Sequence, residues 1–150
     1  MAKKRASAKR YAQAVFAIAR ERDELERWRK DLSRIAEIFS NESIAPVFES
    51  PQVALTEKMA VLKTLLEALE GVQPLALNLA NLLVAKGRVN IAGELAEEYE
   101  ILLDAYKGVA RAEVITAIPL EEEAQRRIAH YLSQLLGKEI KLVPRVDPTV

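Results

Sequence analysis

The spacing of apolar residues changes once along the chain, and this change divides the sequence into a helical part and a mixed part. Over residues 6–106 the apolar side chains recur every three or four positions, which is the period of an amphipathic α-helix. After Gly108 the period falls to two, and residues 111–118 alternate as in a β-strand. We therefore predict a helical N-terminal domain over residues 1–107 and a small α/β segment over residues 108–150.

Residues that favour turns divide the helical part into six segments. Asn41-Glu42-Ser43, Gly71 and Gly87 interrupt the apolar period. Pro74 suits the first turn of a helix, where its missing N–H leaves no hydrogen bond unmade. The predicted helices cover approximately residues 7–20, 23–39, 44–48, 56–69, 74–85 and 88–106. The expected fold class is therefore mainly α, with a six-helix N-terminal bundle.

The second segment has the pattern strand, helix, strand. A helix is expected from Pro119 to Gly137, and the glutamates in its first turn favour the positive end of the helix dipole. The second strand is expected over residues 139–146, where Pro144 limits hydrogen bonding on one side. Two strands and one helix are marginal as an independent unit. We expect this α/β segment to be incomplete, or to be completed by a partner.

The residue types of the chain argue against catalysis. Its one histidine, His130, lies in the middle of a predicted helix, and there is no cysteine. No glycine-rich phosphate-binding motif is present. The side chains of Glu121 to Glu123 point in different directions around a helix, so they cannot converge on one metal ion. We therefore predict a non-catalytic protein that needs no cofactor and no metal.

Basic residues are concentrated at the start of the chain, although the whole sequence has 22 basic and 22 acidic residues and no net charge. The balance gives no general electrostatic reason to bind a polyanion. We expect the basic tip to be a solvated tail, with docking on an acidic partner or on nucleic acid as the alternatives. The five basic residues of the tip are Lys3, Lys4, Arg5, Lys9 and Arg10.

Two of the predicted helices carry apolar side chains around almost their whole circumference. Between Tyr11 and Ala19 only Gln13 is polar, and between Leu75 and Ala85 only two asparagines are polar. A helix on the outside of a small bundle needs only one apolar face. Both helices could be central and covered by the others, but two enclosed helices are difficult to cover in about 100 residues. We expect a shared groove for an amphipathic helix of another chain.

Five motifs in the correct order resemble the delta subunit of F-type ATP synthases, the family of the mitochondrial oligomycin-sensitivity-conferring protein. The similarity extends over the whole chain. The motifs are RYAQAVF at 10–16, ERW at 26–28, NLL with GR at 81–88, AEVITAIPL at 112–120 and KLVPRVDP at 141–148.

This resemblance implies a structural role in ATP synthesis driven by proton transport. The N-terminal domain of family members grips N-terminal helices of the alpha subunits, and the C-terminal domain meets the b-type peripheral stalk. The chain is therefore expected to be a stator subunit that links the catalytic head to the stalk and resists the torque of the rotor. The resemblance also implies the residues that line the groove, namely Tyr11, Ala14 and Ile18 on the first helix and Asn78, Asn81 and Leu82 on the fifth.

Two further expectations concern the ends of the chain and its location. Family members continue after the Asp-Pro turn with a glycine-rich hairpin and a last helix, so a chain that stops at Val150 is expected to be either truncated or naturally shortened in its second domain. No apolar run reaches the roughly 18 residues that span a bilayer, and the first residues contain no hydrophobic signal region. The expected location is the cytoplasmic face of a bacterial cell membrane, as a peripheral subunit.

Overall fold

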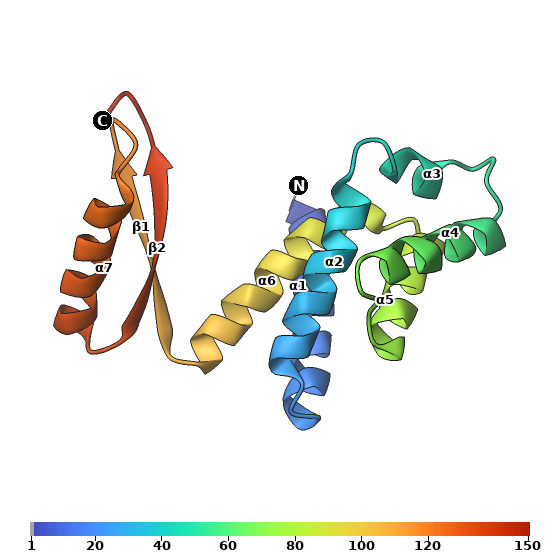
Figure 1. The fold of residues 1–150 in the computed structure, drawn as a ribbon, viewed down its shortest axis with the longest axis horizontal. Helices are drawn as coiled ribbons and strands as arrows, with labels where there is room; N and C mark the ends of the chain where they lie inside the picture. The colour runs from blue at the N-terminus through green and yellow to red at the C-terminus, as the bar shows by residue number, and fades with distance from the viewer. Residues whose placement is uncertain (1) are drawn as a thin grey trace. The chain divides into compact units, whose positions relative to one another are not determined.

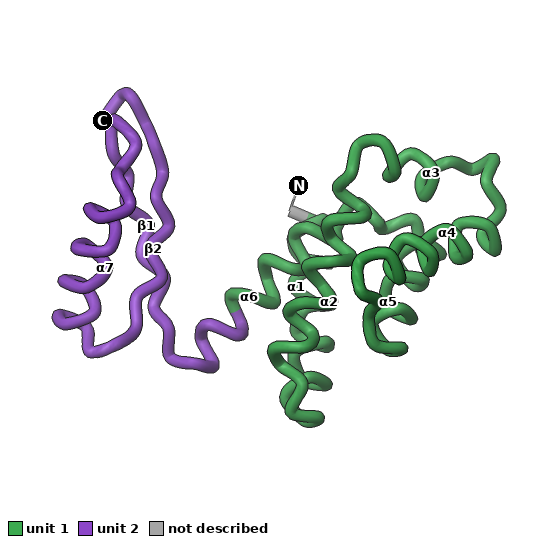
Figure 2. Tube along the Cα trace, in the orientation of Figure 1, with its two compact units in different colours: residues 1–101 green, residues 102–150 purple. Residues whose placement is uncertain are grey.

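The computed structural model describes residues 2–150, apart from the side chain of Ala2, and the chain divides into two compact units (Figure 2). Unit 1 covers residues 1–101 and unit 2 covers residues 102–150. The elements, labelled in Figure 1, are α1 (Ala2–Glu21), α2 (Leu25–Ser40), α3 (Ala45–Glu49), α4 (Leu55–Ala68), α5 (Pro74–Ala85), the 3₁₀ turn η1 (Val89–Ile91), α6 (Ala92–Tyr106), β1 (Val109–Thr116), α7 (Glu122–Leu136) and β2 (Glu139–Val146).

The fold class is confirmed: a helical bundle precedes a small strand, helix, strand segment. The division between units 1 and 2 falls within α6, whereas the sequence places the domain boundary after residue 107, and that boundary stays a prediction. The helix predicted over residues 74–85 and the strand predicted over residues 139–146 have the bounds of α5 and β2. The other elements differ at one or both ends.

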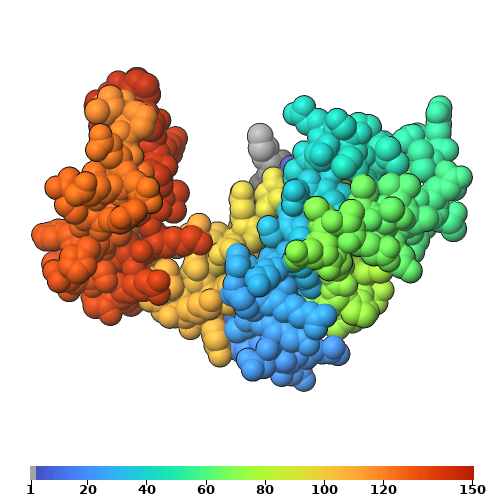
Figure 3. Space-filling view, viewed as in Figure 1, coloured from blue at the N-terminus to red at the C-terminus, as the bar shows by residue number. Residues whose placement is uncertain are grey.

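The helix α2 is the centre of unit 1, because it packs against α1, α3, α4, α5 and η1. Figure 3 shows residues of α2 and α4 side by side on one face of this unit. The buried side chains of α2 recur at helical spacing and include Trp28, Leu32 and Ile35. Burying such a stripe removes apolar surface from water, which is the main driving force for this bundle.

Tyr99 of α6 connects three helices of unit 1. Its side chain is fully buried, and its ring meets the ring of Phe16 of α1 edge to face at 6.0 Å. Its hydroxyl donates a hydrogen bond of 2.5 Å to the carbonyl oxygen of Leu25 of α2. Burial raises the pKa of Tyr99 well above its ordinary value, and the nearby Glu26 carboxylate adds to this shift. The hydroxyl therefore stays protonated and keeps its donor role.

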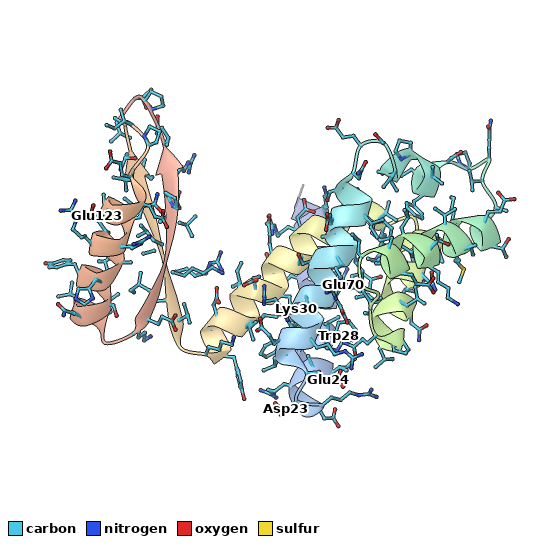
Figure 4. The ribbon with its side chains drawn as sticks, viewed as in Figure 1. Asp23, Glu24, Trp28, Lys30, Glu70 and Glu123 are labelled. Atoms are coloured by element: carbon cyan, nitrogen blue, oxygen red, sulfur yellow. The ribbon has the colours of Figure 1, made fainter. Side chains whose placement is uncertain are left out.

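A second polar link joins α2 to the turn between α4 and α5. Asp31 is buried, and its carboxylate accepts hydrogen bonds from the Gln73 backbone N–H at 3.3 Å and from Arg34 at 3.5 Å. Arg34 also donates to the carbonyl oxygen of Gly71 at 3.2 Å and to Glu70 at 3.1 Å. Glu70, labelled in Figure 4, and Gly71 both have positive φ, so the hydrogen bonds of Arg34 hold a turn of unusual conformation.

Replacing Asp31 by Ala is expected to lower the free energy of unfolding by about 1–3 kcal/mol, because the buried N–H of Gln73 would lose its acceptor. Urea unfolding monitored by the fluorescence of Trp28 measures this loss in unit 1. The matched control is Glu97→Ala, which removes an exposed carboxylate paired with Arg5 and is expected to cost less than about 1 kcal/mol. Equal losses for the two variants would contradict the role assigned to Asp31.

Unit 2 is built on a parallel pair of strands joined by α7. The register pairs Val109 with Glu139 at one end and Thr116 with Val146 at the other. The alternation predicted for the first strand is confirmed within β1, because Ala112 and Val114 are half-buried and Arg111, Glu113 and Ile115 are exposed. The last turn of α6 is tied to the sheet by Asp104, which pairs with Arg111 of β1 at 2.6 Å and with Lys141 of β2 at 3.5 Å.

The predicted restriction at Pro144 lies on the open edge of β2. The backbone N–H of Asp147 donates to the carbonyl oxygen of Thr116 at 2.8 Å. The backbone N–H and C=O groups of the odd-numbered residues of β2 therefore point toward β1. Pro144 therefore faces away from β1, and no ladder hydrogen bond is lost there. A third strand on that edge would lack one donor.

Three predicted helix starts are wrong, and one of them is that of α6, which begins at Ala92 after η1 and not at residue 88. The first helix begins at Ala2 and not at residue 7, so the basic tip forms its first turns and is not a solvated tail. Lys4 and Arg5 pair there with glutamates of α6. The last helix begins at Glu122 and not at Pro119, because Glu121 is extended and precedes the first helical residue.

Candidate partner-binding surface

The three candidate residues of α1 lie beside its buried stripe and not within it. The buried stripe consists of Ala8, Ala12, Val15 and Ala19. At about 100° per residue, the candidates lie roughly a quarter of a turn away from this stripe, on one side of the helix. Tyr11 is half-buried, Ala14 is exposed, and Ile18 is 38 % exposed. We call these three residues the α1 face.

The three candidate residues of α5 lie on the side of the helix opposite its buried residues. Ala76, Ala80, Leu83 and Val84 face the core. Asn78 is exposed and Leu82 is 41 % exposed, whereas Asn81 is half-buried and its Oδ1 is buried without a hydrogen-bond partner. We call Asn78, Asn81 and Leu82 the α5 face. The apolar circumference noted in the sequence thus gives α5 both a core face and an exposed face.

The two helices that carry these faces share their neighbours in unit 1. Both α1 and α5 pack against α2 and against the 3₁₀ turn η1. A cavity of about 650 Å³ lies where the first half of α1 meets the segment after α5, and we call it the basic cavity. Its lining consists of Lys3, Lys4, Ala6, Ser7, Lys9, Arg10, Gln13, Arg88, Asn90 and Ile91.

Arg88 and Asn90 form one wall of this cavity, and the sequence does not predict either of them as a candidate binding residue. The Gly87-Arg88 pair after α5 is its only signal in the sequence, and such a pair by itself does not indicate which helix it meets. The packing of η1 against α1 is a tertiary contact between distant parts of the sequence, and the apolar period does not predict it.

Unit 2 has an exposed apolar surface of its own on α7. No residue of this helix is buried, although its polar and apolar residues are well separated. Tyr131 is 65 % exposed and Leu135 is 67 % exposed, and their spacing of four places them on one face. A large apolar surface of this kind usually marks a contact with another molecule.

The described residues contain no arrangement suited to catalysis. Within residues 2–150 no three histidine, aspartate or glutamate side chains gather in a way that could hold a metal ion. His130 is exposed on α7. In the same part of the chain, no helix combines the length and the apolar character that crossing a bilayer requires. The surfaces described above are suited to binding other proteins.

Comparison with known proteins gives one consistent result. Residues 8–150 match the family model described as ATP synthase delta (OSCP) subunit. The ATP synthase subunit delta of Dehalococcoides mccartyi is 37 % identical over 95 % of this chain and 77 % of the relative. The protein of the same name from Caldanaerobacter subterraneus is 32 % identical over 95 % of this chain and 79 % of the relative.

A solved structure agrees with the sequence comparisons. A chain in the cryo-EM structure of the Toxoplasma gondii mitochondrial ATP synthase hexamer aligns with a TM-score of 0.66 and 26 % identity, over 93 % of this chain and 78 % of that chain. These matches give no support to the alternative of a nucleic-acid-associated protein. The chain therefore belongs to the ATP synthase delta (OSCP) subunit family, as a non-catalytic component of the peripheral stalk.

Proposed function

We propose that the α1 face and the α5 face together bind an N-terminal helix of the ATP synthase alpha subunit. The observation that carries this proposal is the exposure of large apolar side chains on both faces, Ile18 at 38 % and Leu82 at 41 %. Covering what remains exposed of each side chain is worth about 1 kcal/mol, at roughly 25 cal/mol per Å² of apolar surface. Family membership supports the choice of partner.

The side chains of the two faces suit a helix more than an extended segment. Ala14 has a small side chain, so the backbone of a partner helix can approach α1 closely. Asn78 and Asn81 supply polar groups at the rim, which can exchange hydrogen bonds with the partner. An amphipathic helix would place its apolar residues at spacings of three and four against Tyr11, Ile18 and Leu82.

The same proposal assigns unit 2 to the b-type peripheral-stalk subunit. Tyr131, Leu135 and Leu136 of α7 are more than half exposed, and they would contact the stalk. A chain that holds the alpha subunit through unit 1 and the stalk through unit 2 resists the torque that the rotor applies to the catalytic head. The bacterial relatives support a peripheral location on the cytoplasmic face of the cell membrane, reached only through the complex.

Calorimetric titration of the chain with a synthetic peptide tests the contact with the alpha subunit. The peptide comprises about the first 20 residues of the alpha subunit from the same organism, a length of about 30 Å as a helix. We expect saturable binding with one peptide per chain. The fluorescence of Trp28 is a poor readout for this contact, because the Trp28 side chain of α2 is buried in the core of unit 1. No measurable heat and no saturation at several temperatures would overturn the proposal.

A further inference from the structure

The basic cavity holds a concentration of positive charge that the rest of unit 1 neutralises only at Lys4. Five of the residues that line it are cationic and none is acidic. They come from two separate parts of the chain, Lys3, Lys4, Lys9 and Arg10 from α1 and Arg88 from the segment after α5. Like charges held close together in a partly enclosed space repel one another, and a bound anion relieves that repulsion.

The acidic partners available in unit 1 lie on the side of α1 that meets α6. There Lys4 pairs with Glu94 at 3.0 Å, and Arg5 pairs with Glu97 at 3.2 Å. Partial burial of the Glu94 carboxyl acts to raise its pKa, but the hydrogen bonds from Lys4 and from the backbone, together with the charges of Lys4 and Arg5, outweigh this effect and lower the pKa. Glu94 is therefore ionised at neutral pH and neutralises Lys4.

The other four cations of the cavity have no such partner. Among the described residues, no carboxylate lies within ion-pair distance of Lys3, Lys9, Arg10 or Arg88. Charges of this kind on a protein surface are normally interspersed with opposite charges. The cavity thus combines a concave shape with an uncompensated charge, and it is suited to carboxylates of another molecule.

The basic cavity continues the α1 face along the same side of the helix. Lys3, Ser7 and Arg10 line the cavity, and the same helical spacing leads from Arg10 to Ala14 and Ile18. From Ile18 to Lys3 the distance along α1 is about 22 Å, at about 1.5 Å per residue. A helix of about 15 residues lying along α1 would therefore cover the apolar face with one part and reach the cavity with the other.

We infer that the basic cavity binds acidic side chains near one end of the same partner helix that occupies the α1 and α5 faces. This inference rests on the proposed function and adds a second contact to it. The carboxylates would lie about 10 Å, or two helical turns, from the apolar residues that cover Ala14. Because the cavity lies beyond one end of the α1 face, contacts with it fix the direction in which the partner helix lies.

The test compares charge reversal inside and outside the cavity, with the full chain and the alpha-subunit peptide. The variant R10E/R88E places two carboxylates in the cavity, and the matched control K63E/R127E makes the same change of net charge at exposed positions of α4 and α7. We expect R10E/R88E to weaken binding of the peptide about tenfold or more, with a smaller salt dependence, and the control to change the affinity less than about threefold. Circular dichroism spectra equal to that of the unchanged chain verify the folding of both variants, and R10Q/R88Q serves as a milder version of the first.

A second peptide, with its aspartates and glutamates replaced by asparagine and glutamine, identifies the groups on the partner. It is expected to bind the unchanged chain about tenfold more weakly than the original peptide, and to bind R10E/R88E with the same affinity as the unchanged chain. Equal binding of the original peptide to the unchanged chain and to R10E/R88E would overturn the inference and leave the proposed function intact.

Two other outcomes would also overturn the inference. Failure of the original peptide to bind the unchanged chain would remove the proposed function with it. The unchanged chain could instead bind single-stranded DNA or vesicles that contain phosphatidylserine. If R10E/R88E loses that binding and keeps the same affinity for the peptide, the cavity binds phosphate groups and not carboxylates of the partner helix.

Discussion

Replacing Ala14 by Asp is expected to lower the affinity for the alpha-subunit peptide by more than about 100-fold. Ala14 is exposed between Tyr11 and Ile18 on the α1 face, where the proposed partner helix would cover it. An aspartate there would bring a charge without a partner into an apolar contact, at a cost of about 3 kcal/mol or more. Calorimetric titration of the variant with the peptide measures the loss.

The matched control for this substitution is Ala60→Asp. Ala60 is also exposed in the interior of a helix, but on α4, which carries neither face. The control is expected to bind the peptide with unchanged affinity and to have the helical content of the original chain. Retention of full affinity by Ala14→Asp would exclude the α1 face as the binding surface.

Replacing Tyr99 by Ala is expected to lower the free energy of unfolding of unit 1 by about 3–5 kcal/mol. The substitution leaves a cavity between α1, α2 and α6, and it removes the donor to the Leu25 carbonyl oxygen. Small domains have a total stability of about 5–15 kcal/mol, so a large part of it would be lost. Urea unfolding followed by the fluorescence of Trp28 gives the value.

Two companion variants separate the contributions of Tyr99. Tyr99→Phe keeps the ring and removes only the hydroxyl, so it is expected to cost about 1 kcal/mol. Ile101→Ala truncates a residue of the same helix that is 42 % exposed, and it is expected to cost less than about 1.5 kcal/mol. A loss for Tyr99→Ala no greater than that for Ile101→Ala would contradict the linking role of Tyr99.

The apolar period predicts most of the fold, because each element buries one face. The bounds of α5 follow from Pro74 at its start and from Lys86-Gly87 at its end. The half-buried residues Ala112 and Val114 of β1 follow from alternation. Alternation does not predict the parallel pairing of β1 with β2, since two strands that alternate in the same way are compatible with either direction.

The start of α1 is the clearest failure, and its cause is a tertiary contact. A run of lysines and arginines with no apolar period resembles a solvated tail when the sequence is considered alone. In the fold, Glu94 and Glu97 of α6 pair with Lys4 and Arg5, which stabilises the first turns of α1. Residues about 90 positions apart cannot be paired from local pattern.

The sequence predicts that a partner-binding surface exists on two helices, but it does not predict all the residues that form it. Surplus apolar surface on two helices indicated a contact with another chain, and the exposure of Ile18 and Leu82 agrees with that interpretation. The six candidate residues came from family resemblance, and their part in binding stays a prediction. The basic cavity was not predictable, because it forms only where α1 meets Arg88 and Asn90.

Cross-linking in the assembled ATP synthase tests the central claim most directly, and the absence of cysteine from this chain makes single-cysteine variants unambiguous. Ile18→Cys and Leu82→Cys report on the two faces, and Ala60→Cys on α4 is the control. With a cysteine introduced into the N-terminal segment of the alpha subunit, both face variants are predicted to form a disulfide with alpha, and the control is predicted to form none. A cross-link from Ala60→Cys with none from either face variant would contradict the account.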